Sequence, residues 1–580
     1  MGADQLRVLS NRSLESELYT PIPEGYVPGQ TKYVVVLGSV MSGLGKGTFA
    51  SSLGLLLQQR GLTVTSLKFD GYLNVDAGTL NPFRHGEVFV LEDGTECDMD
   101  LGNYERFLDQ DLSQENYLTG GKIFQQVLTK EREGHFLGRD VQFIPHVTGE
   151  IKGFLRKLAL KRKADVVIVE VGGTIGDLEN NYFVEAMREL AYEEGTASTC
   201  FVNVTYVAKP STLGEQKTKP AQQGMRQLLS LGIQSHVIVV RCTEPLSEKT
   251  LQKISLYSNV PPARVIGLPD AQSTYEVPLM LQQAGADQAV LEVLSIPTLP
   301  IVTNTAQQSP WHAFVSRLRN PEHKVTVAIT GKYTTVRDSY HSILNALEHA
   351  GAASATQVDV RWVDTQPITD VTLASEALQG VAGVVVPGGF GARGAEGKIN
   401  CIRYAREHAL PFLGLCYGFQ LAVVDVARNV CGLTGANSTE IDSDTPHPVI
   451  TLLPEQYRIE GLGGNMRLGG RDITLTAGSQ VAKLYHSTLA RERFRHRYEV
   501  NPEYIAQLEA GGLVFSGRAA GQPIMQYLEL SKHPYFVASQ AHLEFTSRPL
   551  RPNPAFTGLV QAMLGQPAVQ SQSVPVASSG

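Results

Sequence analysis

The chain has 580 residues and a formal net charge of −7, with 42% hydrophobic and 18% charged residues. This length exceeds what a single hydrophobic core normally supports and predicts two or three domains. The composition is that of a folded globular protein rather than a disordered one. The acidic balance argues against a general nucleic-acid binder, which needs excess Lys and Arg to displace counterions.

The cysteine pattern indicates a reducing compartment. The six cysteines show neither paired spacing nor a metal-binding motif, which argues against a disulfide framework. No run of about 18 apolar residues is present, and the polar, proline-bearing start does not fit a signal peptide. We therefore expect a cytoplasmic protein that binds neither membrane nor nucleic acid.

Three breaks organise the chain. Residues 1–30 are expected to form a flexible N-terminal extension, and the mixture of proline and polar residues at 286–323 is typical of a linker. The tail at 565–580 has the composition of a disordered segment. Two domains are then expected, at 31–285 and at 324–564.

Both domains alternate apolar runs with helix-like segments, which predicts buried parallel strands. In the first domain the runs are 33–38, 63–70, 165–171, 201–207 and 235–241. In the second they are 325–331, 358–364, 383–389 and 411–416. We predict an α/β fold with two doubly wound parallel sheets, whose ligands bind beyond the carboxyl ends of the strands.

A glycine-rich loop, GSVMSGLGKGT at 38–48, follows the first predicted strand and precedes a helix. Glycines let backbone amides approach phosphate oxygens, and the helix N-terminus adds partial positive charge. The loop therefore predicts a nucleotide phosphate site in which Lys46 reaches the terminal phosphates. The alternative is a glycine-rich turn without a ligand.

The loop departs from the usual pattern at the magnesium position. Gly47 stands where Ser or Thr normally follows the lysine, and Thr48 comes one residue later. A magnesium ion would then need other ligands, for which Asp98, Asp100 and Glu170 are candidates. Each carboxylate could instead be a solvated loop residue.

The second domain carries a Gly-x-Cys-x-Gly turn between a predicted strand and helix. This turn would expose the thiol of Cys416 at a helix N-terminus, which favours the thiolate. The glycines of VVVPGGFG at 384–391 offer backbone amides for an oxyanion hole. His542 and Glu544 would complete a Cys-His-Glu triad. The alternative for a lone cysteine is inert packing.

Together the two centres predict an ATP-dependent amidotransferase. One half would release ammonia from an amide, and the other would use ATP to turn a poor leaving group into phosphate so that ammonia can displace it. Free ammonia is mostly protonated at neutral pH, so a joined domain that passes it internally is favoured.

Many ordered motifs resemble the CTP synthase family, from about residue 33 to residue 549. They include GSVMSGLGKG, NVDAGT, HGEVFV, DMDLGNYERF, VEVGGTIGD, GEQKTKP, VPGGFGARG, GLCYGFQ, RHRYEVN and HLEFTSRP. The resemblance implies a synthetase (amidoligase) domain followed by a class I glutaminase domain, a ligase that forms a C–N bond. It also implies that ATP and Mg²⁺ phosphorylate the position-4 oxygen of UTP before ammonia from glutamine displaces the phosphate to give CTP.

The resemblance also implies roles for individual residues. For ATP they are Ser42, Gly43, Leu44, Gly45, Lys46, Gly47, Lys68, Arg241 and Asp270. For UTP and the feedback inhibitor CTP they are Ser42, Asp177, Glu179, Glu185, Lys217, Lys219 and Lys253. For magnesium they are Asp100 and Glu170. For glutamine they are Gly389, Gln420, Glu440 and Arg497, beside the catalytic Cys416, His542 and Glu544.

Further implications concern regulation and assembly. His85 matches the residue that gates the ammonia path, and Arg393 lies on the loop where the activator GTP is expected to act. The family implies a homotetramer promoted by nucleotides. Two alternatives from other classes are a cobyrinate-type synthase, which lacks NVDAGT, HGEVFV and GEQKTKP, and a decayed enzyme that persists as a scaffold.

Four positions depart from the family pattern. Gly71 replaces a proline, and LENNYF at 178–183 replaces a segment with Ser and Pro. Ala392 stands where an aromatic residue often follows PGGFG, and Leu543 separates His542 from Glu544 in place of proline. Leu543 either loosens this turn, so that Leu543→Pro is harmless or beneficial, or packs in an apolar pocket that proline cannot fill.

Overall fold

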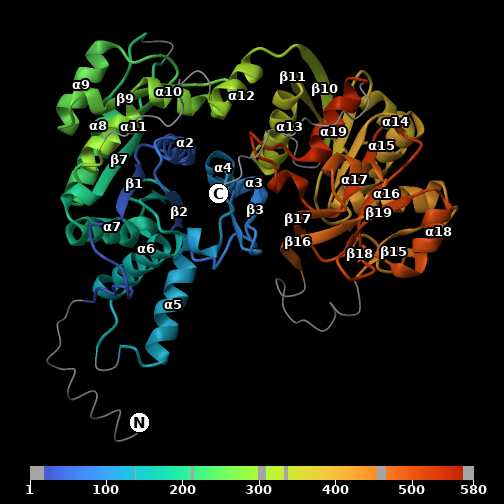
Figure 1. Cartoon of the computed structure of the whole chain (residues 1–580), viewed down its shortest axis with the longest axis horizontal. Coiled ribbons are helices and arrows are strands. Elements are labelled where there is room, and N and C mark those ends of the chain that lie inside the picture. Colours follow the sequence, from blue (N-terminus) through green and yellow to red (C-terminus); the bar gives the residue numbers. More distant parts are fainter. Residues whose placement is uncertain are drawn as a thin grey trace, which may run out of the picture. The chain divides into compact units, whose positions relative to one another are not determined.

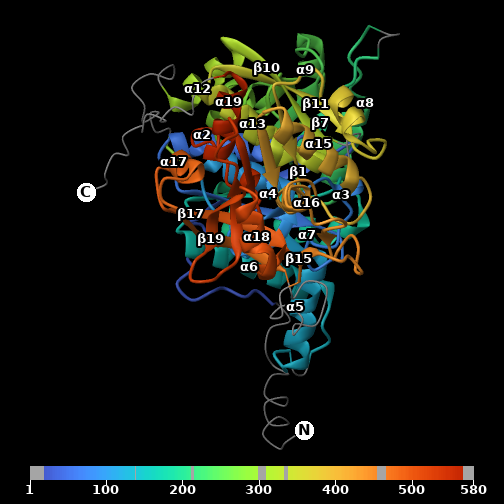
Figure 2. The same cartoon turned by 90° about the vertical axis from the view of Figure 1, so that its right-hand side faces the viewer.

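The computed structural model describes residues 19–136, 139–210, 214–297, 309–331, 337–452 and 466–565. The chain divides into two compact units (Figures 1 and 2). The first unit consists of Met1–Thr79 and Asp100–Ser309, and the second of Leu80–Met99 and Pro310–Gly580.

The described part of the first unit contains a seven-stranded sheet in the order β5-β2-β6-β1-β7-β8-β9, and every pair in it is parallel. Its strands are β1 (Lys32–Gly38), β2 (Val64–Asp70), β5 (Tyr117–Thr119), β6 (Val166–Val171), β7 (Thr199–Tyr206), β8 (Val237–Cys242) and β9 (Val265–Pro269). The five predicted strands are present. The prediction missed β5, which has three residues, and β9, whose sequence contains Gly and Pro.

Helices connect the parallel strands of the first unit, as crossover connections require. They are α2 (Lys46–Gln59), α4 (Met99–Leu108), α5 (Gly120–Arg132), α6 (Thr148–Arg162), α7 (Asn181–Glu194), α8 (Lys219–Ser230) and α9 (Glu248–Ser258), and α10 (Val277–Gln283) and α11 (Ala286–Val293) follow the last strand. Beyond the carboxyl end of β1, Gly45 adopts a left-handed conformation with φ 81° and begins α2. This turn brings the glycine-rich loop to the edge of the sheet where ligands bind in such folds.

The described part of the second unit contains a nine-stranded sheet in the order β11-β10-β12-β13-β21-β20-β19-β16-β17. The strands from β11 to β21 are parallel, and the remaining four run antiparallel. They are β10 (His323–Gly331), β11 (Thr356–Asp364), β12 (Gly383–Val386), β13 (Phe412–Leu415), β16 (Arg467–Leu475), β17 (Leu489–His496), β19 (Val514–Ala519), β20 (Met525–Glu529) and β21 (Phe536–Ser539).

The α/β architecture in two domains is confirmed, and the parallel pattern of the second sheet ends at β21. Strands β16 and β17 mix buried and exposed residues, as half-buried antiparallel strands do. A search for continuous apolar runs therefore passed over them. The smaller sheets pair β3 (Val88–Val90) with β4 (Glu96–Asp98), and β15 (Pro448–Thr451) with β14 (Asn437–Ser438) and β18 (Glu499–Val500).

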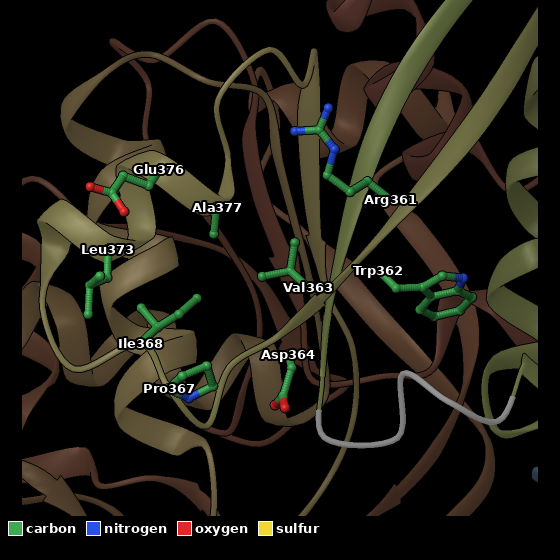
Figure 3. A pocket seen from close by; sticks show the side chains of 9 residues that line it. All are labelled: Arg361, Trp362, Val363, Asp364, Pro367, Ile368, Leu373, Glu376 and Ala377. Carbon is green, nitrogen blue, oxygen red and sulfur yellow. The ribbon is translucent and has the colours of Figure 1, made fainter.

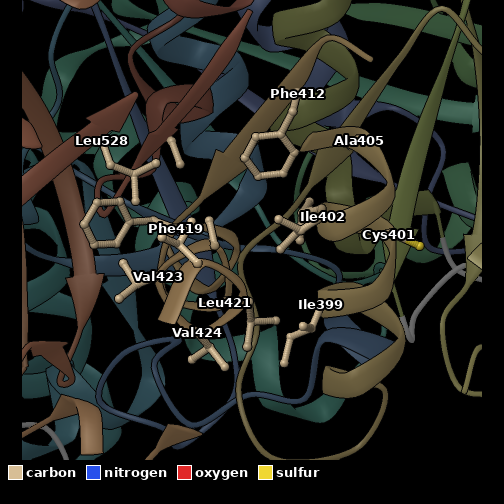
Figure 4. Close-up of a cluster of buried hydrophobic side chains, with 14 of the residues drawn as sticks. Ile399, Cys401, Ile402, Ala405, Phe412, Phe419, Leu421, Val423, Val424 and Leu528 are labelled. Carbon is tan, nitrogen blue, oxygen red and sulfur yellow. The ribbon is translucent and has the colours of Figure 1, made fainter. Parts of the chain in front are cut away.

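Helices cover both faces of the second sheet. Val384 and Val386 of β12 contact one apolar cluster, whereas Val385 between them contacts another, as alternation along a strand requires. Figure 4 shows part of the first cluster, where Phe412 of β13 and Phe419 of α16 lie near Ile402 of α15. The helices of this unit are α3 (Pro82–His85), α12 (Pro310–Arg319), α13 (His341–Ala353), α14 (Val371–Ala377), α15 (Ala395–Glu407), α16 (Tyr417–Asn429), α17 (Gln480–Tyr485), α18 (Ile505–Ala510) and α19 (Pro554–Met563).

The units differ from the expected boundaries in three places. Leu80–Met99 belongs to the second unit, and α11 extends the first unit into the expected linker. Tyr26, in the expected N-terminal extension, is buried and donates a hydrogen bond of 2.9 Å to Glu194. Residues 1–18, 298–308 and 566–580 of the expected extension, linker and tail lie outside the described residues.

Candidate active sites

The loop between β1 and α2 places a buried lysine at the carboxyl end of the first sheet. Lys46 is the first residue of α2, and its Nζ donates a hydrogen bond of 2.6 Å to the carbonyl of Gly173, just after β6. A Cβ on Gly38 would lie 2.9 Å from this Nζ, so the glycine makes room for the ammonium group. Burial lowers the pKa of Lys46. A phosphate oxygen is a suitable partner for such a group.

Two carboxylates converge on a second lysine. Nζ of Lys68 on β2 lies 2.7 Å from Oδ2 of Asp100 and 3.1 Å from Oε1 of Glu170. Tyr104 donates a hydrogen bond to the other oxygen of Glu170. Burial raises the pKa of Glu170, and the charge of Lys68 opposes that shift. Lys68, Asp100 and Glu170, which lie far apart in the sequence, therefore form one cluster.

This cluster fits a magnesium ion bound partly by the protein. A Cβ on Gly47 would lie 2.3 Å from Oδ1 of Asp100, which places this carboxylate beside the phosphate-binding loop. Mg²⁺ usually takes one or two protein carboxylates and completes its shell with water and phosphate oxygens. No group of three His, Cys, Asp or Glu residues in the described chain could hold a metal. Asp98, the third candidate, lies on β4 in the second unit.

The residues expected near adenine lie together at the carboxyl ends of neighbouring strands. Arg241 of β8 pairs with Asp270, directly after β9, at 2.8 Å. Because β8 and β9 are parallel neighbours, their carboxyl ends meet at the same edge of the sheet. Ser42, Gly43 and Leu44 lie in the loop before α2.

Two of the lysines expected at UTP, Lys217 and Lys253, act on the exposed carboxylate of Glu215. Lys217 pairs with Glu215 at 3.0 Å, and this hydrogen bond, together with the charges of Lys217, Lys249 and Lys253, lowers the pKa of Glu215. Lys219 begins α8, after the same loop. The loop and the start of α9 thus gather positive charge suited to a triphosphate.

The acidic residues expected at the pyrimidine nucleotide lie around the start of α7. Oδ2 of Asp177 accepts a hydrogen bond of 2.7 Å from the backbone N–H of Thr174. Glu179 lies in the short 3₁₀ turn Leu178–Asn180, and Glu185 on α7 pairs with Arg188 at 2.5 Å. These contacts lie within the helix and the turn before it.

The second unit has a strained turn at its cysteine. Cys416 lies between β13 and α16 with φ 48° and ψ −96°, a conformation that non-glycine residues rarely adopt. Its backbone N–H donates a hydrogen bond of 2.7 Å to the carbonyl of Ser539 at the end of β21. The turn directs the thiol to the N-terminus of α16, where the helix dipole favours a thiolate.

Cys416, His542 and Glu544 form a triad. Nδ1 of His542 lies 2.7 Å from Oε1 of Glu544. Burial alone would lower the pKa of His542, but the charge of Glu544 and the interaction with Cys416 outweigh it and raise this pKa to about 10. Glu544 therefore favours the protonated form of the imidazole beside the thiol.

The sulfur of Cys416 has two further polar neighbours that the sequence analysis missed. Sγ lies 3.7 Å from the carbonyl oxygen of Arg495 and 3.7 Å from Nε2 of Gln540. Oε1 of Gln540 accepts a hydrogen bond of 3.4 Å from Gln420, which also donates one of 3.1 Å to the carbonyl of Tyr498. The place of Gln540 two residues before His542, next to the predicted triad, was the available signal.

The glycine loop after β12 lies against the triad. A Cβ on Gly388 would lie 2.8 Å from Cε1 of His542, so this position requires glycine. The backbone N–H of Gly391 donates a hydrogen bond of 3.0 Å to Glu440, a residue expected at glutamine. Gly389 lies between them, where its amide can serve an oxyanion.

Lys398 is a second residue that the sequence analysis missed. It is buried on α15, and its Nζ donates a hydrogen bond of 3.2 Å to the carbonyl of Pro387 and lies 5.4 Å from the ring centre of Tyr417. The hydroxyl of Tyr417 donates to the carbonyl of Gly391 at 2.8 Å. The side chains of Lys398 and Tyr417 therefore hold the glycine loop in place through its backbone carbonyl groups. A lysine inside a helix of mixed charge gave no signal in the sequence.

The remaining candidates lie at varied distances from this centre. Arg497 is half-buried at the end of β17, near Gln420 through the neighbouring Tyr498. Arg393 and Ala392 are exposed in the loop before α15. His85 is exposed at the end of α3, in the second unit rather than the first.

An open groove of about 450 Å³ lies along β11 and α14 (Figure 3). Its lining combines Trp362, Ile368 and Leu373 with the charged Arg361 and Glu376. Strands β10 and β12 separate β11 from β13, which precedes Cys416. None of the candidate site residues lines this groove.

Two family models match the chain. The model described as CTP synthase N-terminus covers residues 32–296, and the model described as glutamine amidotransferase class-I covers residues 335–562. No helix in the described chain is long and apolar enough to cross a membrane.

Curated relatives match over almost their whole length. A CTP synthase of Thermococcus gammatolerans is 50% identical over 92% of this chain and 98% of its own, and one of Pyrococcus furiosus is 49% identical with the same coverage. One of Thermus thermophilus is 47% identical over 93% of this chain and 98% of its own. Among solved structures, the glutaminase domain of Trypanosoma brucei CTPS with bound acivicin is 34% identical over 42% of this chain and 96% of its own, with a TM-score of 0.40.

Proposed function

Since this chain belongs to the CTP synthase family and is a glutamine-hydrolysing ligase, we propose that its two units divide the reaction between the two clusters described above. The second unit hydrolyses glutamine at Cys416. The first unit uses ATP to activate UTP and adds the released ammonia. The observation that carries this division is the triad of Cys416, His542 and Glu544 in one unit and the cluster of Lys68, Asp100 and Glu170 in the other.

The glutaminase step follows from the protonated His542. The thiolate of Cys416 attacks the side-chain amide carbon of glutamine, and backbone amides of the glycine loop stabilise the oxyanion. His542 donates its proton to the leaving nitrogen, so ammonia departs and a thioester remains. His542 then accepts a proton from water, which attacks the thioester and releases glutamate while Cys416 leaves as thiolate. Glu544 keeps the imidazole oriented through both steps.

The synthetase step uses the positive charges of the first unit. The position-4 oxygen of UTP attacks the γ-phosphorus of ATP, ADP leaves, and ring nitrogen 3 of UTP loses its proton. Ammonia then attacks carbon 4, phosphate departs and the added nitrogen loses a proton. Lys46 and Lys68 lie where they can stabilise charge on the phosphate oxygens. Asp100 and Glu170 would hold Mg²⁺, which when bound supplies charge neutralisation on the triphosphate. Arg241 and Asp270 bind the adenine side of ATP, and Lys217, Lys219 and Lys253 bind the phosphates of UTP.

Regulation and assembly form the remaining part of the proposal. Asp177, Glu179 and Glu185 recognise the pyrimidine nucleotide, whether substrate UTP or inhibitor CTP. GTP activates through the loop of Arg393, and His85 gates the passage of ammonia between the units. The working enzyme is a cytoplasmic homotetramer. The exposed position of Arg393 and the lysines grouped around Glu215 support these nucleotide sites.

The two-site division is tested with Cys416→Ala. We expect the variant to lose glutamine-dependent CTP formation by several orders of magnitude because the nucleophile is gone, and to keep ammonium-dependent formation within about twofold of the wild type, since Cys416 has no part in the first unit's chemistry. CTP release is measured with UTP and ATP, using glutamine or ammonium as nitrogen donor. An equal loss with both donors in a folded variant contradicts the division. Absence of CTP formation by the wild-type chain with either donor would support the scaffold alternative.

A further inference from the structure

The hairpin β3–β4 packs in the second unit, although its sequence lies within the N-terminal part of the chain. Its strands Val88–Val90 and Glu96–Asp98 lie within the segment matched by the N-terminal family model, yet they pack in the second unit. The backbone N–H of Gly470 on β16 donates a hydrogen bond of 2.9 Å to the carbonyl of Glu92 in the hairpin turn. A Cβ on Gly469 would lie 2.5 Å from the backbone N of Gly94. The hairpin is therefore closely fitted to the antiparallel end of the sheet.

Two carboxylates of the hairpin bind three arginines on β17. Nε of Arg491 lies 2.5 Å from Oε1 of Glu92, and Nε of Arg493 lies 3.4 Å from the other oxygen. Nε of Arg495 lies 2.6 Å from Oε1 of Glu96. The three arginines alternate along the strand, so their side chains share one face. Figure 1 shows β3 in blue beside β17 in orange.

The backbone of the same arginines contacts the triad. The carbonyl of Arg493 accepts a hydrogen bond of 2.8 Å from the backbone N–H of His542, and the carbonyl of Arg495 lies 3.7 Å from Sγ of Cys416. The side chains of Arg493 and Arg495 thus bind the hairpin while their carbonyl groups contact the base and the nucleophile. A shift of either arginine toward or away from the hairpin moves a catalytic contact.

An aromatic contact provides a second connection to the base. Phe89 of β3 is completely buried, and its ring centre lies 4.8 Å from that of Phe545. Phe545 is stacked on His542 with ring centres 5.0 Å apart and an interplanar angle of 10°. The guanidinium of Arg493 lies 5.6 Å from the ring centre of Phe89. The orientation of the imidazole therefore depends on packing supplied by the hairpin.

We propose that the hairpin from Val88 to Asp98 positions the glutaminase triad, with Glu96 acting on Cys416 through Arg495 and Phe89 acting on His542 through Phe545. The inference rests on the proposed glutaminase function. The chain continues directly from β4 into α4, whose Asp100 belongs to the magnesium cluster of the first unit. The hairpin therefore ends only two residues before Asp100, which belongs to the site proposed to use the ammonia.

The proposal is tested with Glu96→Gln in the full-length enzyme. Loss of a charge-assisted hydrogen bond to Arg495 is expected to lower kcat/KM for glutamine hydrolysis by about tenfold, while ammonium-dependent CTP formation stays within about twofold. The rate of Cys416 alkylation by iodoacetamide, measured from pH 6 to 10 against a Cys416→Ala blank, should also shift, since it reports on the thiolate directly. Glu96→Asp should restore part of both.

Two further variants complete the design. Asp93→Asn is the matched control, since Asp93 lies in the same hairpin turn and its Oδ1 accepts a hydrogen bond of 3.1 Å from the backbone N–H of Thr95. It should behave as wild type. Phe89→Leu tests the aromatic connection separately and should lower glutamine hydrolysis through His542, with no loss in the ammonium reaction; it takes the place of Glu96→Gln if that variant melts at a lower temperature than wild type.

Two outcomes overturn the proposal. The first is wild-type glutamine hydrolysis and an unchanged alkylation profile in both Glu96→Gln and Phe89→Leu. The second is an equal fall with glutamine and ammonium in a variant that melts as wild type, which would place the effect in the first unit. Failure of the proposed function itself would look different, because the wild-type enzyme would then release no ammonia from glutamine.

Discussion

Thr48 and Glu170 differ in how well their positions suit a magnesium ligand. Thr48 is half-buried in the first turn of α2, one residue beyond the usual hydroxyl position, whereas Glu170 is buried and joined to Asp100 through Lys68. The carboxylates carry the charge that a hard cation prefers.

Thr48→Val is therefore expected to keep most activity with either nitrogen donor. Asp100→Asn and Glu170→Gln are expected to lower both activities by about two or more orders of magnitude, since each removes the charge of a proposed magnesium ligand. Steady-state CTP formation at several magnesium concentrations checks this. A Thr48→Val variant as inactive as the carboxylate variants would show that the hydroxyl is a ligand.

Two departures from the family pattern meet at Gly71. A Cβ on Gly71 would lie 2.4 Å from Oδ1 of Asn180 and 2.8 Å from the carbonyl of Glu179. Asn180 is itself buried, so it has little room to move away. The ring of a proline at position 71 would occupy the same space as the side chain of Asn180. The two departures from the family pattern, Gly71 and Asn180, therefore fit each other.

Gly71→Ala is accordingly expected to destabilise the first unit by about 1–3 kcal/mol through overpacking. Adding Asn180→Ala should recover part of this loss, because one of the two close contacts disappears, while the carbonyl of Glu179 remains. Thermal melting of the two single variants and the double variant measures the coupling. Strict additivity would mean that Gly71 and Asn180 do not share this space.

Leu543 is completely buried in the cluster that includes Leu413, Leu415 and Val481. This burial supports the packing alternative for the residue between His542 and Glu544. Proline would remove most of that apolar contact, whatever it did for the turn.

We expect Leu543→Pro and Leu543→Ala both to weaken the second unit, the alanine variant by about 2–5 kcal/mol as for other buried leucines. Glutamine-dependent CTP formation should fall in both, with ammonium-dependent formation preserved. The two activities are measured beside the melting curve. Wild-type or faster glutamine turnover in Leu543→Pro would instead support the loose-turn alternative.

The sequence indicated many candidate site residues because a glycine loop, and the spacing of His542 and Glu544, can each be recognised within a short segment. The place of Gln540 beside the predicted triad was a signal, but the sequence could not indicate its contact with Cys416, 124 positions away, or the contact of Lys398 with Pro387. Such contacts depend on which strands become neighbours. The pairing of β13 with β21 brings Gln540 to the cysteine, and nothing in the local pattern specifies that pairing.

Strand β17 also carries the buried carboxylate of Glu492, which contacts the segment that follows Glu544. Glu492 accepts hydrogen bonds from Tyr485 and Thr546, each at 2.5 Å, and from Asn553 at 3.0 Å. The same hydroxyl oxygen of Thr546 lies 3.1 Å from the carbonyl oxygen of Leu543. Burial raises the pKa of Glu492 to about 7, although its hydrogen bonds oppose that shift.

This pKa has a defined effect on stability. Because the pKa of Glu492 is higher in the folded than in the unfolded chain, the folded state favours the protonated form. Stability falls as pH rises from the unfolded pKa near 4.5 to the folded value near 7, by about 3 kcal/mol in all. Glu492→Gln, which has no such titration, should melt close to wild type at pH 5 and become relatively more stable toward pH 8. A melting difference independent of pH would contradict this assignment.

The second sheet shows which strands can be predicted from apolar runs and which cannot. Continuous apolar runs identified β10 to β13, since parallel strands covered on both faces are apolar throughout. Strands β16, β17, β19 and β20 mix apolar with polar residues and, like the short strand β21, were not predicted. They nevertheless complete the site, because β17 provides both carbonyl groups that contact the triad.

At the level of the whole chain, composition and motif order predicted two α/β domains and the family. They could not predict that Leu80–Met99 leaves the first unit to join the second, since the hairpin strands have three residues each and their partners lie about 400 positions later. Long-range contacts, such as the pairing of Glu92 and Glu96 with arginines on β17, define their place.

This exchange means that the polypeptide crosses between its units at three points, after residues 79, 99 and 309. A protease that cut once between residues 297 and 309 would remove only one of these crossings. The nicked enzyme would then run as two bands on a denaturing gel yet elute as a single particle under native conditions. Because the chain crosses between the units more than once, we expect the two units to unfold together. Calorimetry should then record a single transition, whereas two domains joined by one linker would give two.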